Sequence, residues 1–328
     1  MVEKRRVAFI LRGLPGLGHV SPAFAIAERL AESNIETHFI TYANGVYFLK
    51  KKKQTNIHEV STPNHEVGMV PWKDMFEVTT DILPLIKKIM PDIVLVDGEF
   101  DAFFLLKRLG IKIVMITTSP YVDHNFGKYS KYADYAESAM KNVDLIIVHG
   151  IDKPKKKSNK MVFVGPLVRK LDFGNNRKLD IIPICIGFEE SKRFLHFARL
   201  IGKIIRSESL VPRFIGSGIA GAKFESEPLQ YFYKAQFIVT HGGMATIEEA
   251  AVLGIPMMLL CDNDQEKRLN ALSAENRGLG VVIDIEKIYN NKIVKSKIKE
   301  LLNLHGCVNP MVNGVSLAVE ALFSDGHV

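Results

Sequence analysis

Cysteine and long apolar runs are both scarce in this sequence, and each scarcity excludes a class of protein. The three cysteines, Cys185, Cys261 and Cys307, are odd in number and far apart, so they offer neither a disulfide framework nor the spacing of a metal site. No apolar run approaches the roughly 20 residues of a membrane-spanning helix. The basic start precedes only a short apolar run, residues 7–11, and then Arg12, which predicts a β-strand and not a signal peptide. We expect a cytoplasmic protein.

The basic clusters of the chain lack aromatic residues. The net charge is +7, and lysines gather at residues 50–53 and 153–160 with no aromatic residue among them. Platforms for single-stranded nucleic acid combine both kinds of side chain, so we expect no nucleic-acid partner. The clusters are interpreted as solvated surface, with peripheral contact at the inner membrane surface as the alternative.

Apolar runs that alternate with helical patterns are present in both halves. With 328 residues, 47% hydrophobic and 24% charged, the chain has material for two globular domains. Such alternation is typical of a parallel sheet with helices on both faces. The predicted fold class is α/β, with two Rossmann-like, doubly wound parallel-sheet domains. Strands are predicted at residues 7–11, 36–41, 93–96, 112–116, 145–148, 181–186, 213–216, 237–240, 257–261 and 281–283. Helices are predicted at residues 22–33, 74–90, 102–109, 129–142, 190–206, 228–234, 245–253, 265–277, 296–303 and 310–323.

One stretch of the second half carries the clearest functional pattern. His241, Gly242 and Gly243 follow a predicted buried strand and precede a helix, and ligands of open α/β sheets bind where such strands end. The glycines permit close backbone approach, and the N–H groups that begin the helix attract anions, above all phosphate. Thr246 and Glu249 share one side of this helix, and Glu249 is suited to accept hydrogen bonds from a ribose diol. A tight turn before a helix that merely packs is the alternative.

Further residues extend this pattern into a family resemblance. Asp264 and Gln265 follow the next strand, and Asn270 lies a little further along. The spacing HGG-x-x-T-x-x-E-A, then G-x-P, then D-Q-x-x-x-x-N-A resembles the donor site of nucleotide-sugar glycosyltransferases of the two-domain GT-B kind. The pattern looks most like that of the UDP-glycosyltransferases and of the enzymes that form lipid II. The resemblance implies that Asp264 and Gln265 contact sugar hydroxyls, and that Asn270 orients the loop or touches phosphate. A capping pair in a loop is the alternative for Asp264 and Gln265.

The resemblance also implies an architecture and a reaction. The two domains are expected to face each other across a cleft. Residues 1–164 would bind the acceptor, residues 165–309 would bind the nucleotide sugar, and a last helix within residues 310–328 would cross back to the first domain. The expected reaction moves a sugar from a UDP-sugar to a hydroxyl of a lipid-linked or small-molecule acceptor, with inversion. No metal is expected: Asp262-x-Asp264 has the form that can hold a divalent ion, but the donor signature explains it better. No cofactor is expected either.

The loop after the first strand supplies a candidate base. Glycines 13, 16 and 18 precede His19, but their spacing is not that of a dinucleotide fingerprint, and no acidic residue ends the second strand. The loop instead resembles the Gly-x-Gly-His-x-x-Pro entry of the same glycosyltransferases, in which the histidine is a catalytic or acceptor-contacting group. Imidazole, with an unperturbed pKa of about 6.5, can take a hydroxyl proton near neutrality. Gly18 is included in the donor site by the same resemblance. Capping or stabilising the loop is the alternative for His19.

Asp97 is the candidate partner of this base. It ends an apolar run and, as a carboxylate at the carboxyl end of a parallel strand, could fix the tautomer of the imidazole. A helix N-cap is the alternative for Asp97, and Glu99 and Asp101 are the runners-up as partner. Arg12 could add positive charge for the leaving group.

Two features of the second half are less regular. By resemblance, backbone groups near Phe224 and Glu225 would recognise uracil, although Phe224 could equally belong to the core. The loop after the first strand of this half has one glycine, Gly187, and two carboxylates, Glu189 and Glu190, where the family usually has a glycine- and serine-rich phosphate loop. Like charge disfavours these carboxylates beside phosphate. Two alternatives remain open: a UDP-sugar 2-epimerase or hydrolase, which can share this architecture, and a catalytically degenerate nucleotide-sugar-binding protein, which the glycine-poor loop motivates.

Overall fold

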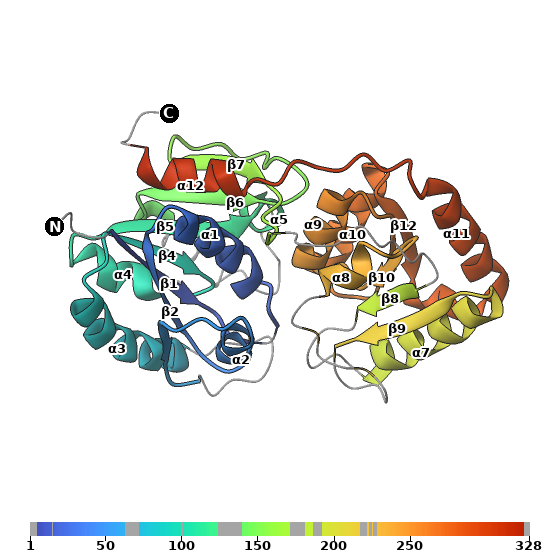
Figure 1. Ribbon diagram of the computed structural model, residues 1–328, viewed down its shortest axis with the longest axis horizontal. Coiled ribbons are helices and arrows are strands. Elements are labelled where there is room, and N and C mark those ends of the chain that lie inside the picture. The colour runs from blue at the N-terminus through green and yellow to red at the C-terminus, as the bar shows by residue number, and fades with distance from the viewer. Residues whose placement is uncertain are drawn as a thin grey trace. The chain divides into compact units, whose positions relative to one another are not determined.

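Two parallel β-sheets organise the chain, one in each of two compact units (Figure 1). Unit 1 consists of residues 1–169 and 314–328, and unit 2 of residues 170–313. The computed structural model describes residues 5–324 except 15, 63–71, 100, 124–139, 171–180, 186–191, 217–221, 223–224 and 226–227. Two parallel-sheet α/β domains were predicted, and this fold class is confirmed.

Unit 1 is built on a seven-stranded sheet in the order β3-β2-β1-β4-β5-β6-β7, with every pair parallel. The strands are β1 (Arg6–Leu11), β2 (Glu36–Thr41), β3 (Ile57–Glu59), β4 (Ile93–Asp97), β5 (Lys112–Thr118), β6 (Leu145–His149) and β7 (Met161–Gly165). The helices are α1 (Val20–Glu32), α2 (Asn44–Lys51), α3 (Trp72–Ile89), α4 (Asp101–Lys107), α5 (Ser119–Asp123) and α12 (Val315–Phe323). Because β1 and β4 pair in register, Leu11 lies opposite Asp97, and the loops that follow both strands leave the same edge of the sheet.

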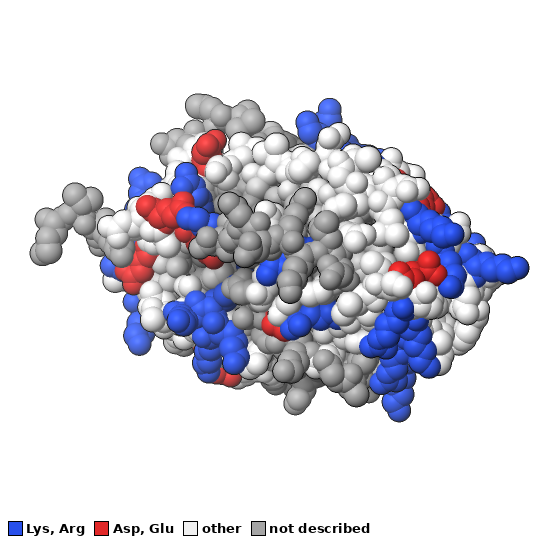
Figure 2. Space-filling view, turned by 45° about the vertical axis from the view of Figure 1, so that its right-hand side comes forward, with Lys and Arg blue, Asp and Glu red and all other residues white. Residues whose placement is uncertain are grey.

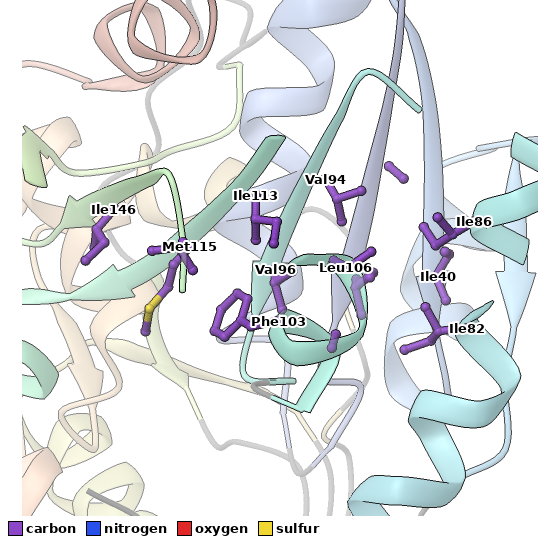
Figure 3. Packing of buried hydrophobic residues seen from close by; sticks show 14 of the residues in the cluster. Ile40, Ile82, Ile86, Val94, Val96, Phe103, Leu106, Ile113, Met115 and Ile146 are labelled. Atoms are coloured by element: carbon purple, nitrogen blue, oxygen red, sulfur yellow. The ribbon is translucent and has the colours of Figure 1, made fainter. Parts of the chain in front are cut away.

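The core of unit 1 follows from the two-residue period of its strands. Val94 and Val96 of β4 point to the same face, where they meet Phe103 of α4 and Ile82 and Ile86 of α3 (Figure 3). The opposite face is covered by α1, whose Phe24 lies near Phe39 of β2. Residues 93–97 are buried throughout, as expected for a central parallel strand with helices on both sides. This packing holds the carboxyl end of β4 in a defined position.

The last helix, α12, belongs to unit 1 although it ends the described chain. It packs against α1, β6 and β7 (Figure 1), and Lys112 Nζ donates to the carbonyl of Leu322 at 2.7 Å. The chain enters unit 1 at Gly314, whose N–H donates to Pro166 O at 2.7 Å. Residues 165–169 therefore stay with unit 1, and residues 310–313 stay with unit 2, where Met311 N–H donates to Ala251 O at 2.9 Å. The domain boundaries predicted from the sequence are 164/165 and 309/310.

Unit 2 is built on a five-stranded sheet in the order β12-β11-β10-β8-β9, again parallel throughout. Its strands are β8 (Ile181–Cys185), β9 (Val211–Ile215), β10 (Ile238–Thr240), β11 (Met257–Cys261) and β12 (Gly280–Asp284). Its helices are α7 (Lys192–Ser207), α8 (Leu229–Phe232), α9 (Met244–Leu253), α10 (Gln265–Asn276), the 3₁₀ helix η2 (Ile285–Tyr289) and α11 (Asn291–Leu304). β10 lies between β8 and β11 at the centre of the sheet. Its carboxyl end is thus fixed from both sides.

Several short elements were not predicted. These are β3, α2, α5 and η2, none of which has a long apolar pattern. α11 begins at Asn291 instead of residue 296, because the Asn290 side chain caps it by accepting from the N–H groups of Lys292 and Ile293. The helix predicted at residues 129–142 falls mostly outside the described residues.

The surface charge of the described residues is distributed over several places. On the face shown in Figure 2, Lys and Arg side chains form separate groups with uncharged surface between them. Within the described part of the chain, no helix has the length and apolarity needed to cross a membrane.

A pair of histidines in unit 1 gives a prediction for stability against pH. His38 Nδ1 and His58 Nε2 lie 3.2 Å apart, with Glu36 Oε1 3.1 Å from His38 Nε2. Burial lowers the pKa of both rings, which Glu36 opposes at His38, and the His38 charge lowers the pKa of His58 further. The unfolded chain therefore takes up protons first as the pH falls below about 6.5, so stability is present above that pH and lost below it. We expect the melting temperature to fall between about pH 7.5 and 5.5, and to fall less in His58→Gln. An identical pH dependence in the variant would contradict this.

Candidate active site

The strand-to-helix corner of unit 2 is formed by the end of β10, residues 241–243 and the start of α9. Gly242 has φ +82°, a left-handed conformation that favours glycine. Gly243 occupies the N-cap position of α9, so no side chain caps the helix. The N–H groups of its first turn are the donors that an α-helix leaves without intrahelical partners. This corner has the backbone chemistry of an anion site.

Gly242 is also packed too closely for any other residue. A Cβ added there would lie 2.3 Å from the carbonyl oxygen of Lys267 in α10. From the same helix, Asn270 is 1% exposed and donates through Nδ2 to the Gly242 carbonyl at 3.1 Å. Of the two roles predicted for Asn270, the structure shows contact with the loop. Its Oδ1 and the Thr240 Oγ1 are buried and have no hydrogen-bond partner among the described residues.

The other predicted residues of α9 and its corner differ in exposure. His241 is half-buried, and its ring centroid lies 5.4 Å from that of Phe194 in α7. Thr246 is half-buried, whereas Glu249 is buried. Burial raises the pKa of the Cys185 thiol, and the charge of Glu249 adds to that rise. Because Cys185 is the last residue of β8, Glu249 lies near the carboxyl end of that strand. The two side chains predicted to share one face of the helix are therefore accessible to different degrees.

Asp264 and Gln265 are both exposed at the start of α10. Asp264 is the N-cap residue of this helix, and its Oδ1 accepts from the N–H of Lys267 at 3.1 Å. The capping alternative therefore describes a contact that Asp264 does make. Gln265, the first helical residue, is exposed beside it.

Glu225 is held by contacts within unit 2. Its Oε1 accepts from Arg213 Nη2 at 2.8 Å and from the Tyr231 hydroxyl at 3.3 Å. The guanidinium of Arg213 lies 4.0 Å from the centroid of the Tyr231 ring. The Oε1 atom of Glu225 is therefore engaged by side chains of unit 2. Phe224 lies outside the described residues, as do Gly187, Glu189 and Glu190.

In unit 1, His19 and Asp97 are in direct contact. His19 Nδ1 lies 2.6 Å from Asp97 Oδ1, and it is the donor because an ionised carboxylate only accepts. The side chain of His19 is 36% exposed and that of Asp97 is 7% exposed. The aspartate is thus fixed inside the unit while the ring remains accessible, and Nε2 is the nitrogen that Asp97 does not engage.

Neither capping alternative describes this pair. His19 stands at the N-cap position of α1, but its side chain makes no capping hydrogen bond. Asp97 is the last residue of β4, several positions before α4 begins at Asp101. The side chain of Asp101, a runner-up, lies outside the described residues. Gly18 precedes the pair, is exposed, and has open space around it.

A cluster of three side chains supports the turn behind Asp97. Arg12 Nη2 donates to Gly98 O at 2.8 Å, and Arg12 Nε lies 3.9 Å from Glu99 Oε1. The hydroxyl of Tyr42 donates to the same Glu99 oxygen at 2.7 Å. From the sequence, Glu99 is expected only as a possible partner of His19, and Tyr42 is not predicted. No sequence signal marked Tyr42, which simply follows β2.

The described residues contain no group of three or more His, Cys, Asp or Glu side chains arranged to hold a metal ion. The groups described above that could contact a ligand are the backbone N–H groups at the start of α9, the His19 imidazole and several carboxylates, which accept hydrogen bonds.

Comparison with known proteins relates the second unit to glycosyltransferases, as the sequence pattern does. Residues 180–306 match the glycosyltransferase family 28 C-terminal domain. The UDP-N-acetylglucosamine–N-acetylmuramyl-(pentapeptide) pyrophosphoryl-undecaprenol N-acetylglucosamine transferase of Clostridium tetani is 25% identical over an alignment of 327 positions, and the match covers 89% of each chain.

Solved structures of glycosyltransferases share the architecture of the whole chain. The structure of Acinetobacter baumannii MurG has a TM-score of 0.63 at 13% identity, covering 96% of this chain and 98% of that one. The calicheamicin glycosyltransferase CalG4 has a TM-score of 0.63 at 15% identity, covering 98% of both chains. These likenesses show the fold. The chain is a glycosyltransferase by its sequence matches and has the two-domain GT-B fold by these likenesses, and its residues 180–306 match the family 28 C-terminal domain.

Proposed function

We propose that this glycosyltransferase moves a sugar from a UDP-sugar to an acceptor hydroxyl with inversion and without a metal ion. The observation that carries the proposal is the uncapped start of α9 at Gly242 and Gly243, within the stretch that matches the family model. Unit 2 would bind the nucleotide sugar, and unit 1 would supply the base.

The donor part of the proposal rests on charge and hydrogen bonding. A diphosphate at the corner would accept hydrogen bonds from the first N–H groups of α9, and the helix dipole favours its negative charge. Asn270 would keep the Gly242 carbonyl turned toward itself and away from the phosphate. Glu249 is proposed to accept from the ribose hydroxyls, and Asp264 and Gln265 to contact the sugar. Recognition of uracil is assigned to backbone groups near Phe224 and Glu225.

The base chemistry rests on the His19–Asp97 contact. As the acceptor oxygen bonds to the anomeric carbon, the bond from that carbon to the diphosphate breaks on the opposite face. The hydroxyl proton passes to His19 Nε2, and the imidazolium that forms is stabilised by Asp97 at Nδ1. The charge that develops on UDP is neutralised by preorganised donors at α9, and such electrostatic stabilisation is usually a large contribution to catalysis.

The acceptor class is proposed from the relatives. The Clostridium tetani relative is named for a lipid-linked acceptor, a pyrophosphoryl-undecaprenol, whereas CalG4 is named for calicheamicin. We propose an acceptor hydroxyl on a lipid-linked or small molecule. A lipid-linked acceptor would bring the protein into peripheral contact with a membrane, for which the exposed lysines near residues 50–53 are suited.

The test is to incubate the protein with a panel of UDP-sugars, with and without polyprenyl-phosphate and small-molecule acceptors. We expect UDP release that depends on both donor and acceptor, an inverted anomeric configuration in the product by NMR, and full activity in the presence of a chelator.

Other products would identify the alternatives. A free sugar or an epimerised sugar formed without acceptor would indicate a hydrolase or a 2-epimerase. Tight binding of a UDP-sugar with no turnover on any acceptor would indicate a degenerate binding protein. Either result would overturn the proposed transfer.

A further inference from the structure

Glu99 is a buried carboxylate that the proposed reaction does not use. It is 5% exposed and lies two residues after Asp97, on the turn that follows β4. Burial raises the pKa of the Glu99 carboxyl, while Arg12 and the hydrogen bond from Tyr42 oppose that rise. A buried carboxylate is costly unless it is paired and hydrogen-bonded, so its position calls for a role.

The contacts of Glu99 lead back to the His19–Asp97 pair in short steps. Tyr42 donates to Glu99 Oε1 at 2.7 Å, and Arg12 Nε lies 3.9 Å from the same oxygen. Arg12 in turn donates through Nη2 to the Gly98 carbonyl at 2.8 Å and through its backbone N–H to the Asp97 carbonyl at 3.0 Å. One arginine therefore holds the carbonyl groups of two consecutive residues, Asp97 and Gly98.

The turn itself leaves little freedom. Gly98 has φ +81°, and a Cβ there would lie 2.8 Å from Arg12 Cβ and 3.3 Å from His19 Cε1. The turn at Gly98 is thus packed closely between Arg12 and His19. Movement of the arginine would therefore displace this turn against the imidazole. The Tyr42 hydroxyl remains a donor, because burial raises the pKa of this phenol.

We propose that Glu99 is a positioning residue for the His19–Asp97 pair: it fixes Arg12 and Tyr42, and through Arg12 the turn at Gly98 that presents Asp97 to His19. Its effect on rate rests on the proposed function, but its effect on the geometry of the pair does not. Glu99 itself is 3.9 Å from Arg12 Nε and acts through that residue.

The experiment compares Glu99→Gln and Tyr42→Phe with a matched control, Asp144→Asn. Asp144 is also a carboxylate of unit 1, although an exposed one, accepting from the Ile113 N–H at 2.8 Å with Lys107 Nζ 3.7 Å away. Among the described residues, neither contact involves His19 or Asp97. The readout is the NMR signal of the His19 Nδ1 proton in protein labelled with ¹⁵N-histidine. This signal reports the hydrogen bond to Asp97 without any substrate.

We expect the two variants to shift this downfield proton signal upfield, or to broaden it through exchange with water, while Asp144→Asn leaves it in place. In the transfer assay both variants are expected to lose about 10- to 100-fold in kcat with the donor KM nearly unchanged. An unchanged His19 signal in both variants would overturn the proposal. An equal change in Asp144→Asn would also overturn it, because the cause would then be a general loss of stability.

The two proposals fail in different ways. If the signal shifts but no acceptor is glycosylated by the wild-type protein, the positioning role stands and the proposed function fails. If Glu99→Gln does not fold, Tyr42→Phe still decides, because it keeps the buried ring and removes only the hydroxyl.

Discussion

Replacing His19 by alanine is expected to lower the rate of sugar transfer by about 10²- to 10⁴-fold, the usual contribution of a general base. The affinity for UDP should stay nearly intact, because His19 belongs to unit 1 and the proposed diphosphate site lies at the start of α9 in unit 2. Initial rates give the first quantity, and calorimetric titration with UDP gives the second.

Two further variants make this result specific. Asp97→Asn should cause a loss of similar order, because an amide that donates to Nδ1 stabilises the tautomer whose Nε2 already carries a proton. His58→Gln removes another histidine of unit 1 and should leave the rate unchanged. Loss of UDP binding together with activity in His19→Ala would refute the assignment of His19 as base.

Gly242→Ala is expected to have the largest effect in unit 2. The added methyl group would enter a left-handed conformation at φ +82° and lie 2.3 Å from the Lys267 carbonyl, which is backbone and cannot rotate away. Either the corner moves or α10 moves, and both distort the first turn of α9. We expect UDP affinity to fall at least tenfold and the melting temperature to drop by clearly more than the few degrees that the conformational cost alone, about 1–2 kcal/mol, would cause.

Gly278→Ala is the matched control for this variant. Gly278 also lies in unit 2 with φ +69°, but a Cβ there meets nothing within 4 Å. It should show only the conformational cost and retain UDP binding. If Gly242→Ala behaves like Gly278→Ala in both measurements, the corner does not bind the diphosphate in the way proposed.

The sequence predicted the long elements well because their patterns are strong. The buried runs of β4 and β11 leave little choice of structure, and the glycine at 254 ends α9 in a left-handed conformation, as a C-terminal cap should. β3 was missed because its three residues, Ile57–Glu59, are partly polar and at the sheet edge. The cap at Asn290 could have been read from its residue type.

The candidate site also contains contacts that the sequence predicts and contacts that it does not. The contact of Asp97 with His19 could be predicted because Asp97 ends an apolar strand, and parallel pairing of β1 with β4 brings the ends of the two strands to one edge. Tyr42 and its bond to Glu99 could not be found, because the two residues are 57 positions apart and share no spacing. The close contact of Gly242 with Lys267 likewise depends on how α9 and α10 pack, which one sequence does not specify.

The most direct test of the account compares calorimetric titrations of the wild-type protein with UDP and with uridine. The account predicts that UDP binds and that uridine binds at least 100-fold more weakly, because the diphosphate would supply the charge-assisted hydrogen bonds to the start of α9. Equal affinity for the two ligands, or no binding of UDP, would contradict it.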